Sequence, residues 1–211
     1  MKMTFFATLA AFMILTLTGC GSSNSNPPTV FVTTITSDAA FDGDIELDFL
    51  SGVLIPTQGS TPFVLAGIDP VNGDEYRAFL DFHLDGANGV PGDAIIESAF
   101  LDIFISNVDI SSPTGTIPLR IDLVSFQPPL LFREAFDFPG LAGTLVSPPI
   151  SLADSGRPVT IDVTSLMNEA QRLSLLDFQV RIMEDDFVFV TPGLIEINET
   201  TRPPQLIVTY F

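Results

Sequence analysis

The chain has 211 residues, with 26 acidic side chains against 8 lysines and arginines, which gives a formal charge of -18 at pH 7. Such an excess of negative charge repels phosphate backbones, so we exclude nucleic acid as a partner. The single cysteine excludes a disulfide within the chain, and the single histidine leaves no histidine pair for a typical zinc site.

The N-terminal segment has the order of a bacterial lipoprotein signal. Lys2 supplies a basic start, and residues 5–17 form an apolar stretch that is too short to span a bilayer. Leu17-Thr18-Gly19-Cys20 then resembles a lipobox, in which cleavage follows Gly19 and the thiol of Cys20 is acylated. We therefore predict a lipoprotein signal peptide over residues 1–19 and lipidation at Cys20. A plain signal peptide with an incidental cysteine is the alternative.

Two or three acyl chains on Cys20 would anchor the protein stably in a membrane. The next residue is Gly21 rather than aspartate, which implies the outer membrane if the host is Gram-negative. Residues 20–28 comprise this acylated cysteine and a stretch of Gly, Ser, Asn and Pro, which we predict to be a flexible tether. The sequence thus predicts an exported, lipid-anchored protein of the cell envelope.

Residues 29–211 are predicted to form one β-sandwich domain. Val, Ile, Thr and Phe recur there in short runs separated by Gly and Pro, and no alternation of strands with helices is apparent. We expect strands or strand-like segments at residues 29–36, 45–49, 62–66, 76–84, 95–108, 117–125, 144–149, 158–163, 176–183, 187–190, 194–197 and 205–211. One short helix is expected up to Arg172, capped by Thr164 or Ser165. The predicted fold class is all-β, a jelly-roll-like antiparallel β-sandwich with one short helix.

Two long strands of one sheet, residues 76–84 and 95–108, organise this domain. On the first strand, one face is apolar and the other carries charge: Ala78, Leu80, Phe82 and Leu84 against Arg77, Phe79, Asp81 and His83. On the second strand, the apolar face holds Ala99, Leu101, Ile103 and Ile105. Residues 128–143 are long and irregular for a connection in a compact domain. We expect their apolar side chains to cap the core: Leu130, Leu131, Phe132, Phe136 and Phe138.

Four stretches in this order resemble the DNRLRE-domain family, jelly-roll β-sandwiches related to carbohydrate-binding modules. They are residues 76–84 (YRAFLDFHL), 96–103 (IESAFLDI), 161–164 (IDVT) and 203–210 (PPQLIVTY). The chain departs from the family because its helix lacks a terminal Trp and because residues 128–143 are atypical. Some members bind polysaccharides such as alginate, so the resemblance implies a jelly-roll fold and a role in glycan binding.

No pattern of residues predicts catalysis. His83 is the only histidine and has no serine or cysteine partner that spacing would identify, and no pair stands out among the acidic residues. No Gly-rich phosphate loop opens a helix. We therefore expect neither an enzyme nor a cofactor. Few residues are candidates for the exposed aromatic rings on which sugars commonly stack. Trp is absent, and both tyrosines, Tyr76 and Tyr210, fall in expected core strands.

Structural calcium is the remaining ion to consider, because residues 38–48 carry five acidic side chains: Asp38, Asp42, Asp44, Glu46 and Asp48. Only Asp42-Gly43-Asp44 has EF-hand-like spacing, and Val53 stands where that motif requires Glu. A solvated strand face is the simpler interpretation. We therefore predict a non-catalytic surface lipoprotein carrying a β-sandwich binding module, with polysaccharide as its candidate ligand. The alternative is a structural or adhesive surface protein that contacts other proteins through sheet edges or through calcium.

Overall fold

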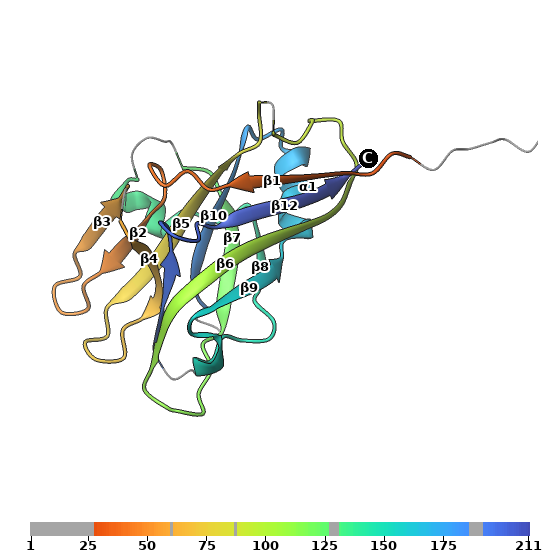
Figure 1. Ribbon diagram of the computed structural model, residues 1–211. Coiled ribbons are helices and arrows are strands. Elements are labelled where there is room, and N and C mark those ends of the chain that lie inside the picture. Colours follow the sequence, from red (N-terminus) through yellow and green to blue (C-terminus); the bar gives the residue numbers. More distant parts are fainter. Residues whose placement is uncertain (1–27, 60, 87, 127–130, 186–191) are drawn as a thin grey trace, which may run out of the picture.

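A computed structural model describes residues 28–59, 61–86, 88–126, 131–185 and 192–211. Gly19, Cys20 and the predicted signal peptide lie outside the described residues, as do Leu130 and the strand expected at 187–190. The described residues contain twelve strands, one α-helix and two short 3-10 helices (Figure 1).

The strands are β1 (Phe31–Thr36), β2 (Gly43–Leu47), β3 (Leu54–Gln58), β4 (Phe63–Ile68), β5 (Glu75–His83), β6 (Ile96–Ile110), β7 (Leu119–Val124), β8 (Ala142–Leu145), β9 (Arg157–Asp162), β10 (Asp177–Glu184), β11 (Gly193–Asn198) and β12 (Gln205–Tyr210). The helices are η1 (Arg133–Asp137), η2 (Leu152–Asp154) and α1 (Thr164–Arg172).

All strand pairs are antiparallel, and the strands join into one curled sheet with the order β1-β12-β6-β11-β4-β5-β10-β7-β8. In addition, β9 pairs with β6, and β2 pairs with both β5 and β3. Strands β1, β12, β6 and β9 form one layer, and β5, β10, β7 and β8 form the other (Figure 1). The predicted all-β antiparallel sandwich with one short helix is confirmed.

The main core lies between the two layers and is built by alternation along each strand. The apolar faces predicted for β5 and β6 both point into it, and Leu80, Phe82, Leu101, Ile103 and Phe178 are at most 1% exposed. Each such side chain contributes roughly 1.5–3 kcal/mol through burial. The two central strands belong to one continuous sheet, as predicted, but they do not pair: they lie in opposite layers and meet across this core (Figure 1).

A break interrupts the sheet between β11 and β12. Both strands run along β6, one after the other, and residues 199–204 leave the sheet between them. The side chain of Asn198 holds this loop, because its Oδ1 accepts hydrogen bonds from the backbone N–H groups of Thr201 and Arg202, both at 2.9 Å. The loop after β1 lies alongside, since the N–H of Ser37 donates to the carbonyl of Pro204 at 3.0 Å. Residues distant in sequence therefore meet at this break.

Two local predictions were wrong or incomplete. Helix α1 begins at Thr164, so its N-cap residue is Val163, which makes no side-chain cap bond. The carboxylate of Asp162 accepts the N–H of Thr164 at 2.9 Å, and the Thr164 hydroxyl accepts the N–H of Ala99. The predicted cap at Thr164 or Ser165 is therefore incorrect. Strand β3 was not predicted, because it contains Pro56 and is partly exposed. Among the described strands it pairs only with β2, so it is an edge strand, which is where a strand tolerates proline.

Candidate functional site

The outer side of β5, β7 and β10 is buried beneath residues 131–138. Their contact builds a second apolar cluster from Ile45, Phe79, Val124, Phe126, Leu131, Ala135 and Phe136, with Phe138 packed against it. The capping role predicted for this segment is confirmed at Leu131, Phe136 and Phe138. Phe132 is the exception, because 46% of it is exposed.

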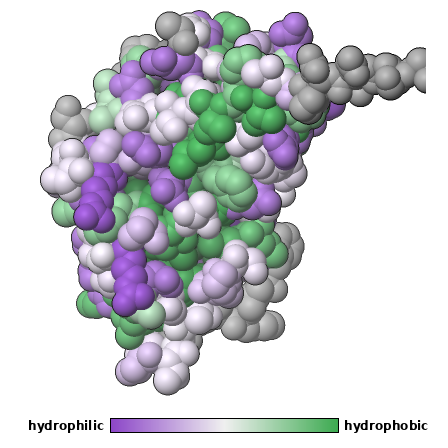
Figure 2. Space-filling model, turned by 45° about the vertical axis from the view of Figure 1, so that its right-hand side comes forward, coloured by the Kyte–Doolittle hydropathy of each residue, from purple (hydrophilic) through white to green (hydrophobic). Residues whose placement is uncertain are grey.

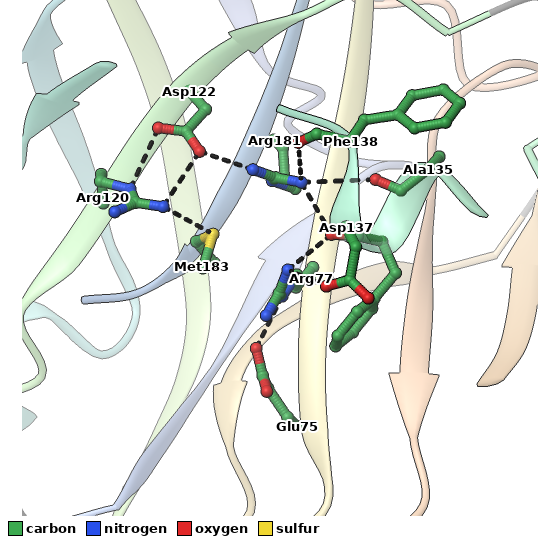
Figure 3. Close-up of polar contacts among 10 residues, drawn as sticks. Glu75, Arg77, Arg120, Asp122, Ala135, Asp137, Phe138, Arg181 and Met183 are labelled. Carbon is green, nitrogen blue, oxygen red and sulfur yellow. Dashed lines mark hydrogen bonds and ion pairs between the residues drawn. The ribbon is translucent and has the colours of Figure 1, made fainter. Parts of the chain in front are cut away.

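Two buried arginines hold this segment against the sheet (Figure 3). Nη1 of Arg77 and Nη1 of Arg181 both donate to the carbonyl of Phe136, at 2.5 and 2.7 Å. The guanidinium of Arg77 also lies 3.7 Å from the centre of the Phe136 ring, and Arg181 bonds the carboxylate of Asp122 at 2.7 Å. We call this set of contacts the polar layer. Its guanidinium groups are committed to carbonyls and carboxylates of the protein, so we assign the layer to structure.

His83 lies at the end of β5 among three carboxylates. Its Nδ1 is 2.7 Å from Asp177 and 3.6 Å from Asp81, and its Nε2 is 3.4 Å from Asp38. The hydrogen bond to Asp177 raises the pKa of His83, against a smaller opposing effect of burial. The imidazole is therefore stabilised as a cation, which disfavours metal ligation because metals bind the neutral ring. His83 is a partly exposed strand histidine in an ion-pair cluster.

The acidic residues of 38–48 do not converge on one point. Asp38 joins His83, Asp42 is buried at the sheet break, and Glu46 and Asp48 lie near Asp74 at the end of the β2–β3 hairpin. In this hairpin cluster, Asp48 Oδ1 accepts the N–H groups of Leu50 and Ser51, and Asp74 Oδ1 accepts the N–H of Phe49. These carboxylates are thus used to close turns.

A cleft of about 490 Å³ opens at one end of the sandwich, where the loop after β5, the C-terminal part of α1 and the end of β12 meet. We call it the end cleft. Its lining consists of Leu84, Asp85, Gly86, Gly89, Val90, Pro91, Gly92, Met167, Gln171, Ser174, Leu175, Leu176 and Tyr210. Both its volume and its mixture of apolar side chains with a few polar groups are typical of small-molecule sites.

The walls of the end cleft are fixed by contacts within the protein. The ring of Tyr210 stacks on Phe31, with ring centres 5.7 Å apart and planes inclined by 24°. Nε2 of Gln171 donates to the carbonyls of Pro91 and Ala94, at 3.1 and 2.7 Å, and so ties the loop to α1. The cleft is therefore largely preformed.

Both tyrosines lie in packed strands as expected, but neither ring is fully buried. Tyr210 also lines the end cleft, which its expected place in a core strand did not indicate. Burial, together with neighbouring carboxylates led by Glu46, raises the pKa of Tyr76 to about 12. The sequence did contain a signal for the position of Tyr210. Tyr210 stands at the end of its expected strand, and side chains at strand ends border the end of a sandwich.

Comparison with known proteins adds no relative: no family model matches the chain, and no curated protein matches it significantly. The resemblance to the DNRLRE-domain family stays a prediction. Among the helices that the structure describes, none combines the length and the apolar character needed to cross a membrane.

Proposed function

We propose that this chain is an exported, lipid-anchored protein of the cell envelope whose sandwich binds a carbohydrate in the end cleft without catalysing a reaction. The cleft itself carries this proposal. It has the volume of a small-molecule site, and it places the partly exposed ring of Tyr210 close to the polar groups of Asp85, Gln171 and Ser174. Sugar rings present both C–H faces, which pack on aromatic rings, and hydroxyls, which need hydrogen-bond partners.

The lining of the cleft supports binding rather than hydrolysis. Glycosidases position two carboxyl groups on either side of the scissile bond. Among the described residues that line the end cleft, Asp85 is the only one with a carboxylate. A site with a single carboxylate can accept hydrogen bonds from sugar hydroxyls but lacks the second group that such a reaction requires.

The charge of the protein favours a neutral carbohydrate. The chain carries a formal charge of -18, and the described lining of the cleft contains one acidic residue and no lysine or arginine. An anionic polysaccharide such as alginate would meet repulsion both from Asp85 and from the overall field. The end of a neutral polysaccharide would meet no such electrostatic repulsion.

Titration calorimetry of the purified protein with neutral and acidic oligosaccharides tests this proposal. The variant D85A should bind the neutral ligand about tenfold or more weakly, because a hydrogen bond to a charged group contributes roughly 1.5–3 kcal/mol. The matched control is D93A, which removes an exposed carboxylate from the same loop but outside the lining. Equal effects of the two substitutions, or no heat with any oligosaccharide, would refute carbohydrate binding in the cleft.

The anchor is tested separately by growing expressing bacteria with a palmitate analogue that can be labelled. The order of basic start, apolar stretch and lipobox supports lipidation at Cys20. The wild-type protein should incorporate the label and partition with membranes, whereas C20S should do neither. Label retained by C20S would show that acylation, if it occurs, does not use this thiol.

The structural or adhesive function is favoured by one further observation, the exposed edge of the sheet at β1. Among the strands that the structure describes, β1 pairs only with β12. Val30, Phe31 and Val32 are 54%, 52% and 65% exposed. Figure 2 shows hydrophobic residues gathering in the upper part of one face of the molecule. Exposed edge strands can add a strand from another chain.

Analytical ultracentrifugation over a range of protein concentrations tests this function. Association that rises with concentration and that V32K abolishes would support it, and a monomer at all concentrations would refute it.

A further inference from the structure

Three oxygen-bearing side chains meet at the sheet break between β11 and β12, and no catalytic or structural role described above uses them. They are Ser37 from the loop after β1, Asp42 before β2, and Glu199 directly after β11. Their exposed fractions are 7%, 1% and 4%. We infer that Ser37, Asp42 and Glu199 form a binding site for a divalent cation of the calcium type.

Four oxygen atoms of this group are buried without a hydrogen-bond partner among the described residues. They are Oγ of Ser37, Oδ2 of Asp42, and both Oε1 and Oε2 of Glu199. The hydroxyl of Ser37 and the carboxyl of Glu199 both lie close enough to Asp42 to influence its pKa. The two carboxylates cannot pair with each other unless one of them is protonated, because ionised carboxylate oxygens only accept hydrogen bonds. Buried polar atoms are normally paired, and leaving one unpaired costs about 1–3 kcal/mol. Four such atoms, grouped around Asp42, indicate a ligand.

The charges at this break indicate that the ligand is a cation. Neither Asp42 nor Glu199 forms an ion pair with an arginine or the histidine among the described residues, although both carboxyls are almost fully buried. Two carboxyl groups that are buried side by side repel each other when both are ionised, so only a proton or a positive ion allows them to lie together. A divalent cation neutralises two carboxylates and coordinates their oxygens at the same time.

Calcium fits the chemistry of these donors. All three side chains offer hard oxygen atoms, and calcium prefers carboxylate, hydroxyl and carbonyl oxygens over nitrogen or sulfur. Two other clusters of acidic residues in the described chain could also hold a metal ion, but their carboxylates already have partners within the protein. At the hairpin, Asp48 and Asp74 already accept backbone N–H groups, and in the group around Asp177 the cation His83 supplies the positive charge.

Backbone contacts hold the three side chains in place. The remaining oxygen of Asp42, Oδ1, accepts the N–H of Asp81 on β5 at 2.7 Å. The N–H of Glu199 donates to the carbonyl of Pro62 at 3.1 Å, and the N–H of Ser37 donates to Pro204 at 3.0 Å. A bound cation would therefore tie the loop after β1 to the end of β11, across the point at which the sheet is interrupted.

The test uses the purified protein stripped with EDTA and titrated with calcium chloride in a calorimeter. We expect one site, with affinity reduced at least a hundredfold in E199Q and in D42N, because each substitution removes one of the two carboxylates. Glutamine has nearly the shape of protonated glutamate, so E199Q should keep the fold in EDTA. D48N is the matched control, because it removes a carboxylate from the hairpin cluster, and it should bind calcium as the wild type does.

Thermal unfolding provides the second readout. Calcium should raise the Tm of the wild type and of D48N but not that of E199Q. Should E199Q or D42N fail to fold, S37A keeps both charges and should bind calcium several-fold more weakly. Absence of calcium binding, binding that these substitutions leave unchanged, or an equal response to magnesium would each overturn the inference.

Discussion

The polar layer and the sheet break are both buried polar regions beside β5, yet they are built in opposite ways. In the polar layer, positive guanidinium groups meet carboxylates and carbonyls: Arg181 bonds Asp122 and the carbonyls of Phe136 and Phe138. At the sheet break, Asp42 and Glu199 meet without a positive side chain, and the described residues leave their inward oxygens unpaired. In the first region the chain supplies groups of opposite charge, Arg181 and Asp122, whereas the second requires a proton or an ion from solution.

This difference separates a structural role from a binding role. Burying a charge is tolerated when the protein supplies its partners, and the result is a contact that fixes one arrangement of the chain. Burying two like charges without partners leaves a region whose stability depends on solution conditions. The two regions should therefore respond differently to substitution, pH and calcium.

The largest effect is expected from removing a charge at the centre of the polar layer. R181M should lower the free energy of unfolding by about 3 kcal/mol or more, because it leaves Asp122 buried with one partner fewer and removes the donor to the carbonyl of Phe138, while Arg77 still bonds the carbonyl of Phe136. Denaturant unfolding measures this loss. R120M is the matched control, since Arg120 contacts the same carboxylate but is 25% exposed and water can replace it. Equal losses in both variants would show that burial does not distinguish these contacts.

A smaller effect is expected at Phe136, where the layer meets its covering segment. F136L keeps an apolar side chain in the second cluster but loses the ring that lies 3.7 Å below the guanidinium of Arg77. We expect a loss of about 1–2 kcal/mol, from the cation–π contact and from imperfect packing. F132L alters a ring in the same segment that is 46% exposed, and its unfolding midpoint should stay unchanged. A larger loss in F132L than in F136L would contradict the assigned packing.

The sequence predicted the main core well and the two polar regions poorly. Alternation placed Leu80 and Phe82 correctly, because a period of two is a property of every strand. The same alternation could not show that Arg77 is buried, since charged residues on one strand face are typical of a solvated sheet. The long segment after β7 contained the hint, in Phe136 and its apolar neighbours.

The sheet break was beyond sequence reasoning. Asp42 belonged to a run of acids that resembled a solvated face, and Glu199 lies far along the chain in an unremarkable Asn-Glu-Thr turn. Only the folded topology, with β11 and β12 in line along β6, brings these two carboxyls together. The end cleft was missed for a related reason, because it is built from ends of three elements that no local pattern connects.

The pH dependence of stability should reveal the carboxyl pair in protein stripped with EDTA. Burial raises the pKa of Glu199 in the folded state, and the nearby Asp42 raises it further. A raised pKa means that folding favours the protonated form, so this stability is complete below the unfolded pKa near 4.5 and is lost as the pH rises towards the folded pKa. The wild type should therefore lose stability relative to E199Q as the pH rises from about 5 towards about 10.

Chemical denaturation of both proteins at each pH measures this difference. Asp44 and Asp81 also have raised pKa values through burial, but both are present in the variant and cancel in the comparison. Saturating calcium should flatten the difference in the wild type, because the ion takes the place of the proton. Parallel pH profiles in EDTA would show that Glu199 is not protonated in the folded protein.

The smallest effect is expected at the exposed ion pair on α1. Arg172 donates two hydrogen bonds to Glu169, at 2.6 and 2.7 Å, and this contact lowers the pKa of Glu169. Its geometry is as good as that of the Arg181–Asp122 pair, but water surrounds it and screens the charges. E169Q should leave the Tm unchanged within the error of a thermal scan at moderate salt. A loss as large as that of R181M would mean that hydrogen-bond geometry, rather than burial, gives the polar layer its strength.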